Sequence, residues 1–161
     1  MQMTLEEAPA SAVSPATIEL LLFRLGGDRK GERSELFAIN VVNVREIVAM
    51  PSVTAIAGAL PHVLGVVNLR GDIVRVVDLP SLAGCVPATG FNIMLVTDIG
   101  ATAQAFAVES VEEIVVIGSH DLVADAYPAG CGMVSAVARI DAGKRLAQVL
   151  DVASVLRSLT M

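Results

Sequence analysis

The chain has 161 residues, of which 54% are hydrophobic and only 17% are charged, and its formal net charge is −6. This length suffices for one domain or two small subdomains with a buried core that needs no metal or disulfide. An acidic chain without a basic stripe does not favour nucleic acid as a partner, because nothing offsets repulsion from phosphates. Aromatic residues make up only 3%, so the core must be aliphatic, and the abundance of valine favours strands over helices.

The longest uncharged stretch, residues 47–69, is interrupted by two prolines and two glycines. No clean apolar run of about 18 residues remains, so we predict no membrane-spanning segment. Residues 1–17 contain two glutamates and no apolar centre, unlike a signal peptide, and their content of Ala, Ser and Pro predicts a disordered tail. We therefore expect a cytoplasmic protein.

Short apolar runs separated by Gly, Pro and Asp turns predict strands along most of the chain. A charged, glycine-rich loop is expected at residues 26–35, and a second loop at residues 120–132. Residues 43–50 fit either a continued strand or a short turn of helix, and Pro51 ends them. The predicted strands are residues 18–25, 36–42, 52–56, 66–69, 73–77, 91–96, 103–109, 114–117, 133–140 and 145–150.

The second half of the chain starts after a junction at residues 85–90, which is rich in small residues, Pro and Gly. We therefore divide the chain into two intertwined β-barrel subdomains, approximately residues 18–85 and 86–159. Residues 152–159 are expected to form a short terminal helix, with Asp151 as its N-cap.

The clearest hairpin lies within residues 65–82, where two valine-rich runs flank the turn Arg70-Gly71-Asp72. Arg70 at this tip must be exposed. Two readings of it are open: a solubilising turn charge, or a residue held on a rigid support to meet a partner. The inward face of this hairpin is expected to consist of Val67, Leu69, Val74 and Val76.

The two halves of the chain share a weak internal repeat. The run Val44-Arg45-Glu46-Ile47-Val48 resembles Val111-Glu112-Glu113-Ile114-Val115, and each follows a similar Phe-Ala-aliphatic triplet. Both halves also contain a late hairpin that ends near an aspartate, Asp78 or Asp151. Short strands at such spacing predict two small barrels side by side. The alternative is coincidence among valine-rich strands.

No pattern typical of a catalytic or metal site is present. The only two histidines, His62 and His120, have no neighbouring ligand at metal spacing, and there is no nucleophile elbow or phosphate-binding glycine loop. We therefore expect no enzyme, no metal and no cofactor. A docking protein fits this composition best, because docking needs an apolar patch rimmed by charge. The alternatives are a barrel that binds a small molecule in an aliphatic groove, and an enzyme with an unrecognised site.

Four segments resemble the CheW-like domain family: residues 20–25, 36–47, 65–79 and 106–114. The most specific part is the V-x-N-L-R-G segment, Val66-Val67-Asn68-Leu69-Arg70-Gly71, and the resemblance extends over about residues 19–159. The amino-acid sequence of the first two segments is especially similar to the amino-terminal domain of CheV coupling proteins.

The resemblance implies an all-β fold of two SH3-like five-stranded barrels with short helices. It implies a non-catalytic adaptor in bacterial chemosensory arrays that links the cytoplasmic tip of methyl-accepting chemoreceptors to the histidine kinase CheA. In the family, the regulatory domain of the kinase docks on the first barrel, and the receptor tip lies in the groove between the barrels. No receiver-like acidic cluster with its lysine precedes Met161, so the chain corresponds to a stand-alone CheW-type adaptor or to the coupling domain of a CheV-type protein.

The resemblance also implies which residues contact partners. Val44 is expected to give apolar contact, and Glu46 and Arg70 are expected to place opposite charges at a rim. Arg75 stands where many relatives have proline, which adds a positive charge to that strand. The complete implied set is Val41, Val44, Glu46, Gly65, Asn68 and Arg70.

Overall fold

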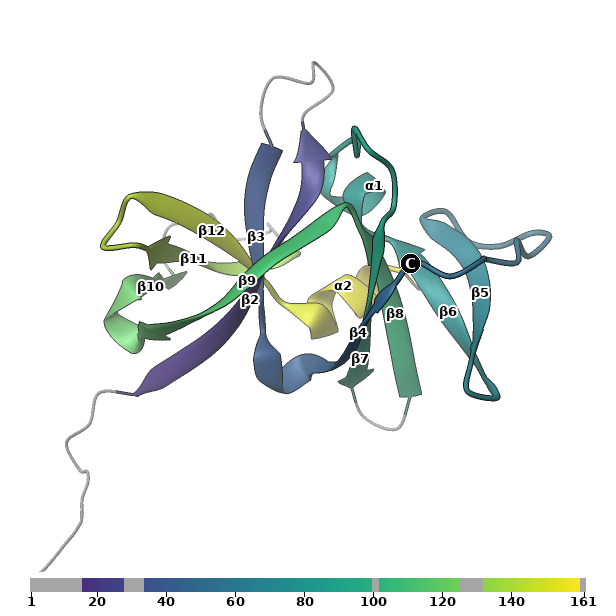
Figure 1. Cartoon of the computed structure of the whole chain (residues 1–161), viewed down its shortest axis with the longest axis horizontal. Helices are drawn as coiled ribbons and strands as arrows, with labels where there is room; N and C mark the ends of the chain where they lie inside the picture. The colour runs from purple at the N-terminus through teal and green to yellow at the C-terminus, as the bar shows by residue number, and fades with distance from the viewer. Residues whose placement is uncertain (1–15, 28–33, 100–101, 125–131, 160–161) are drawn as a thin grey trace, which may run out of the picture.

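The computed structural model describes residues 16–27, 34–99, 102–124 and 132–159 (Figure 1). The predicted tail, residues 1–17, lies outside the described residues up to position 15, and Thr17 already begins the first strand.

The described chain forms two β-sheets with short helices (Figure 1). The five-stranded sheet has the order β4-β7-β8-β6-β5 and consists of β4 (Val44–Ala49), β5 (Val63–Leu69), β6 (Asp72–Asp78), β7 (Ile93–Ile99) and β8 (Thr102–Val108). The six-stranded sheet has the order β10-β11-β12-β3-β2-β9 and consists of β2 (Thr17–Gly27), β3 (Ser34–Asn40), β9 (Ser110–Gly118), β10 (Leu122–Val123), β11 (Val134–Ile140) and β12 (Arg145–Leu150). The helices are α1 (Leu79–Ala83) and α2 (Val152–Ser158), with 3-10 turns η1 (Val41–Asn43) and η2 (Ser119–Asp121).

The predicted all-β class with short helices is confirmed, but one sheet has six strands, where five were predicted. The sixth strand is β10, which has two residues and lies inside the predicted loop of residues 120–132. It pairs with β11. The strand predicted at residues 52–56 does not form, and only Thr54 makes an isolated bridge, to Val66. Most of that segment is exposed, so no burial stabilises an extended strand there.

The sheets do not follow the predicted division of the chain at residues 85 and 86, because each half sends one hairpin into the other sheet. The hairpin β2–β3 lies beside β9 and β12, and the hairpin β7–β8 lies beside β4 and β6. Each hairpin joins its sheet through one parallel pairing, β12 with β3 and β6 with β8. The internal repeat is present in the topology. Each strand of the first repeat has neighbours in its sheet equivalent to those of the corresponding strand of the second repeat. The corresponding pairs are β2 and β7, β3 and β8, β4 and β9, β5 and β11, and β6 and β12.

The exchanged hairpins are buried on both faces, which explains their unbroken apolar runs. Along β2, Leu20 and Leu22 face the interior of the six-stranded sheet, and Leu21 and Phe23 face the other way into a core shared by both sheets. The hairpin β7–β8 repeats this alternation, with its other face in the interior of the five-stranded sheet. The two sheets are therefore joined by a continuous apolar core, which contains Phe23, Phe37 and Phe106 among aliphatic side chains.

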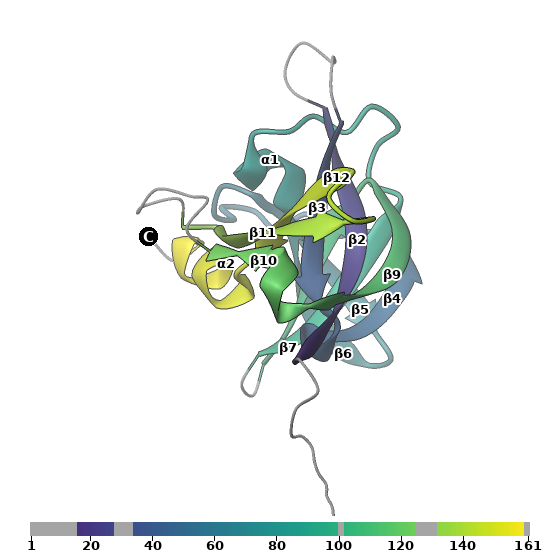
Figure 2. The same ribbon diagram turned by 90° about the vertical axis from the view of Figure 1, so that its left-hand side faces the viewer.

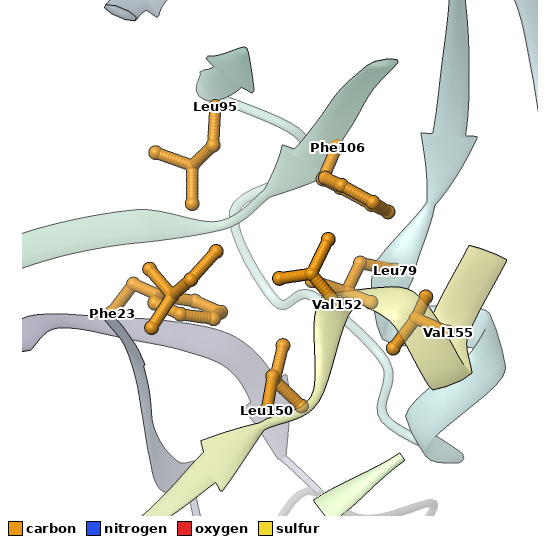
Figure 3. Close-up of a pocket in the computed structure, with 8 residues that line it drawn as sticks. Phe23, Leu79, Leu95, Phe106, Leu150, Val152 and Val155 are labelled. Atoms are coloured by element: carbon orange, nitrogen blue, oxygen red, sulfur yellow. The ribbon is translucent and has the colours of Figure 1, made fainter. Parts of the chain in front are cut away.

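Figure 3 shows the centre of this shared core, where Phe23, Leu95, Phe106, Leu150 and Val152 converge from both sheets and α2. The cavity between them is about 10 Å³ and is lined only by apolar side chains. A space of about one water molecule without polar partners holds no organic ligand. This centre therefore serves packing.

Both repeats end in a capped helix. The carboxylate of Asp78 accepts a hydrogen bond from the backbone N–H of Ser81, and Asp151 does the same for Ser154, at 3.0 and 3.3 Å. Asp151 is thus the N-cap that the sequence predicts. Both helices lie on one side of the molecule, and β4 and β9 lie on the other (Figure 2).

Candidate functional site

The hairpin β5–β6 ends in a two-residue turn formed by Arg70 and Gly71. Their φ angles are 52° and 91°, so both lie in the left-handed region that a type I′ turn requires. The side-chain oxygen of Asn68 accepts a hydrogen bond from the backbone N–H of Gly71 at 2.8 Å. Asn68 therefore fixes the turn, and the turn places Arg70 at the tip, as the sequence predicts.

The guanidinium of Arg70 forms a bidentate ion pair with Glu46 on β4. Nη1 donates to Oε2 at 2.7 Å, and Nη2 donates to Oε1. The two residues differ in exposure, since 69% of the Arg70 side chain is accessible and only 16% of that of Glu46. Because β4 and β5 are opposite ends of the sheet order, this pair helps to bring the two edges of the five-stranded sheet together.

A backbone bridge between β5 and the segment that follows β4 explains Gly65. Thr54 and Val66 exchange backbone hydrogen bonds of 2.9 Å in each direction. Gly65, beside this bridge, has φ of 148°, and a Cβ atom added to it would lie 2.1 Å from the carbonyl oxygen of Thr54. Only glycine fits this close approach of two backbones. The structure thus gives Gly65 a folding role of its own.

A shallow groove of about 260 Å³ runs between β4 and the β2–β9 pair. Of the predicted site residues, Val41, Val44 and Glu46 line it. Ile47 and Ile114 form exposed apolar walls, with 43% and 54% of each residue accessible. The remaining lining residues are Leu21 and Arg45.

The structure therefore brings Val41, Val44 and Glu46 together in one groove and attaches Arg70 to it through the ion pair. It places Asn68 and Gly65 outside the groove, as supports of the hairpin. The sequence-predicted set omits Ile47 and Ile114. A signal for them was present, because they occupy matching positions in the two Val-x-Glu-Ile-Val repeats.

Hydrogen bonding to Arg70 holds the pKa of the Glu46 carboxyl below its usual value, against an opposing effect of burial and with help from the charges of Arg70 and Arg45. Glu46 in turn raises the pKa of Arg70. The pair is therefore fully ionised at neutral pH.

A pH titration tests this pairing. Because the folded-state pKa of Glu46 is lowered, the stabilisation it contributes is present above its unfolded pKa and is lost as pH falls through the folded value. We expect the carboxyl carbon of Glu46, followed by NMR, to titrate at lower pH than an ordinary glutamate. In Arg70→Gln its midpoint should return towards the usual range. Equal midpoints in the two proteins would show that Arg70 is not the cause.

Within the described residues, no three or more His, Cys, Asp or Glu side chains come together in a group that could bind a metal ion. In the same ranges no helix has the length and apolar character needed to span a membrane. The described site consists of an apolar groove beside an exposed, ion-paired arginine.

Comparison with known proteins gives matches along most of the chain. A family model described as the CheW-like domain matches residues 19–160. Chemotaxis protein CheV3 of Helicobacter pylori is 28% identical over 163 residues, which are 96% of this chain and 52% of that protein. A probable chemotaxis protein CheW of Rhizobium etli is 30% identical over 101 residues, 62% of this chain and 61% of that protein. The chain thus spans between half and two thirds of these relatives' length.

A solved structure has the same fold. The crystal structure of the scaffolding protein TtCheW from Thermoanaerobacter tengcongensis superposes with a TM-score of 0.71, covering 86% of this chain and 90% of that one, at 21% identity.

Proposed function

Because this chain belongs to the CheW-like domain family, we propose that it is a non-catalytic chemotaxis adaptor that couples methyl-accepting chemoreceptors to the histidine kinase CheA. Relatives named as chemotaxis proteins support this function, and a scaffolding protein shares the fold. The observation that carries the proposal is the apolar groove beside the ion pair of Glu46 and Arg70. An apolar surface rimmed by charge binds a protein partner and sets its orientation.

The two partners take different parts of this surface. The groove, with Val41, Val44 and Ile47, receives the helical cytoplasmic tip of the receptor, because an apolar depression between two sheets suits the apolar stripe of a helix. The hairpin tip, with Arg70 held by Glu46 and shaped by Gly65 and Asn68, contacts the regulatory domain of the kinase.

The protein acts in the cytoplasm, at membrane-associated receptor arrays. It works as a stand-alone CheW-type adaptor or as the coupling domain of a CheV-type protein. Similarity to CheV3 over 96% of this chain, which corresponds to 52% of that protein, is compatible with both arrangements.

An acidic substitution in the groove tests the receptor half of the proposal. Ile47→Asp places a charge on an exposed apolar wall, and we expect the affinity for a soluble receptor signalling fragment, measured by calorimetry, to fall about tenfold or more. Leu146→Asp is the matched control, because Leu146 is also exposed, at 60%, but lies on the six-stranded sheet outside the groove. Equal losses in both variants, or no loss in Ile47→Asp, would contradict the assignment of the groove.

A further inference from the structure

The internal repeat builds a second arginine–glutamate pair in the six-stranded sheet. Glu113 on β9 occupies the repeat position of Glu46 on β4. Nη2 of Arg145, the first residue of β12 after the hairpin turn, donates to Oε1 of Glu113 at 2.9 Å. As in the other sheet, an arginine in or directly after the hairpin turn thus reaches the glutamate of the repeat on the end strand of its sheet.

In the second pair, additional carboxylates occupy the remaining guanidinium nitrogens of Arg145. Nε of Arg145 donates to Asp141 at 2.7 Å, and Nη1 lies 3.5 Å from Glu112. Glu112 is itself ion-paired with Arg24 on β2. All three guanidinium nitrogens of Arg145 therefore face acidic groups of its own chain, and only 33% of its side chain is exposed.

Arg70, unlike Arg145, keeps a guanidinium nitrogen, Nε, that has no partner among the described residues. Within the described residues its guanidinium is paired only with Glu46, through one N–H on each Nη. A guanidinium has five N–H donors, so three of them, including Nε–H, remain for another acceptor. With 69% of the side chain exposed, these donors face solvent at the hairpin tip.

We infer that the two related arginines have separate tasks. Arg70 donates its remaining N–H groups to a carboxylate of the bound partner. Arg145 binds Glu113, Glu112 and Asp141 of its own chain and so holds the six-stranded sheet together. This inference rests on the proposed function, since it names the chemistry by which the hairpin tip recognises its partner. Glu46 then serves to position Arg70, because a mostly buried carboxylate has little surface to give. A planar arginine can hold two carboxylates at once without breaking the first pair.

Three variants separate the two tasks: Arg70→Ala, Arg145→Ala and, as a matched control, Lys144→Ala. Lys144 is the exposed turn residue directly before Arg145, and its replacement removes the same charge while leaving the ion pairs of Arg145 in place. Each full-length variant is titrated with the kinase regulatory domain at low and high NaCl, and its thermal melt is recorded.

We expect Arg70→Ala to weaken binding about ten- to hundredfold at low salt and to flatten the salt dependence of the affinity. Arg145→Ala should bind like the unmodified chain but melt a few degrees lower, and Lys144→Ala should match the unmodified chain in both. If Arg145→Ala weakens binding as much as Arg70→Ala, or if the salt dependence survives Arg70→Ala, the inference is overturned.

The unmodified chain separates this inference from the proposed function. If it binds no kinase domain, the proposed function fails for that partner. If it binds and the variants do not differ as stated, only the division of tasks between the two tips fails.

Discussion

Replacing Gly65 with alanine is expected to cost about 4 kcal/mol or more of unfolding free energy, because the closing edge of the five-stranded sheet cannot accept a side chain there. The added Cβ would meet the carbonyl oxygen of Thr54 at 2.1 Å and its carbonyl carbon at 2.7 Å. Both atoms are backbone, so no side-chain rotation relieves the contact. The segment carrying Thr54 must then separate from β5, which breaks both hydrogen bonds of the Thr54–Val66 bridge.

Gly71→Ala is the control for this prediction. Gly71 also has positive φ, at 91°, but a Cβ atom there meets nothing within 4 Å. It should therefore show only the backbone penalty of about 1 kcal/mol. Urea denaturation of both variants gives the comparison. Similar losses in the two would mean that the close approach to Thr54 does not stabilise the sheet.

Reversing the charge at the hairpin tip is expected to have the largest effect on function. Arg70→Glu places a second carboxylate beside Glu46 and removes the donors proposed to meet the partner. We expect the affinity for the kinase regulatory domain to fall about 100-fold or more. Lys144→Glu, the same reversal on the other hairpin, should leave this affinity unchanged.

The exchanged pair, Glu46→Arg with Arg70→Glu, sharpens this prediction. It restores an ion pair between β4 and the tip, so the thermal stability lost in Arg70→Glu should largely return. Binding should not return, because the exposed member of the pair is now a carboxylate. Recovery of binding together with stability would show that Arg70 acts only on the fold, and the proposed contact with the partner would be wrong.

Much of the fold could be predicted from local patterns. The turn at Arg70 and Gly71, the N-cap at Asp151 and the all-β class depend on residues close together in the sequence. The repeat of Val-x-Glu-Ile-Val also indicated two related units. These features need only short-range periodicity and turn chemistry.

Which hairpins are exchanged between the sheets, and which strands they pair with, could not be predicted from local patterns. Pairing of β3 with β12 joins residues more than a hundred positions apart. The local sequence of both exchanged hairpins predicts apolar strands but does not indicate which strands they pair with. For the same reason the sequence did not bring Ile114 to the groove beside Ile47. It also did not separate the folding role of Gly65 from a partner contact, because the contact with Thr54 depends on how the edges of the sheet meet.

An adaptor with separate surfaces for its two partners must bind receptor and kinase at the same time. A receptor signalling fragment, the kinase and this chain are mixed, and the complex is analysed by size-exclusion chromatography with light scattering. We expect one complex that contains all three components and that loses the kinase with Arg70→Glu. Mutually exclusive binding of receptor and kinase, or binding of neither, would contradict it.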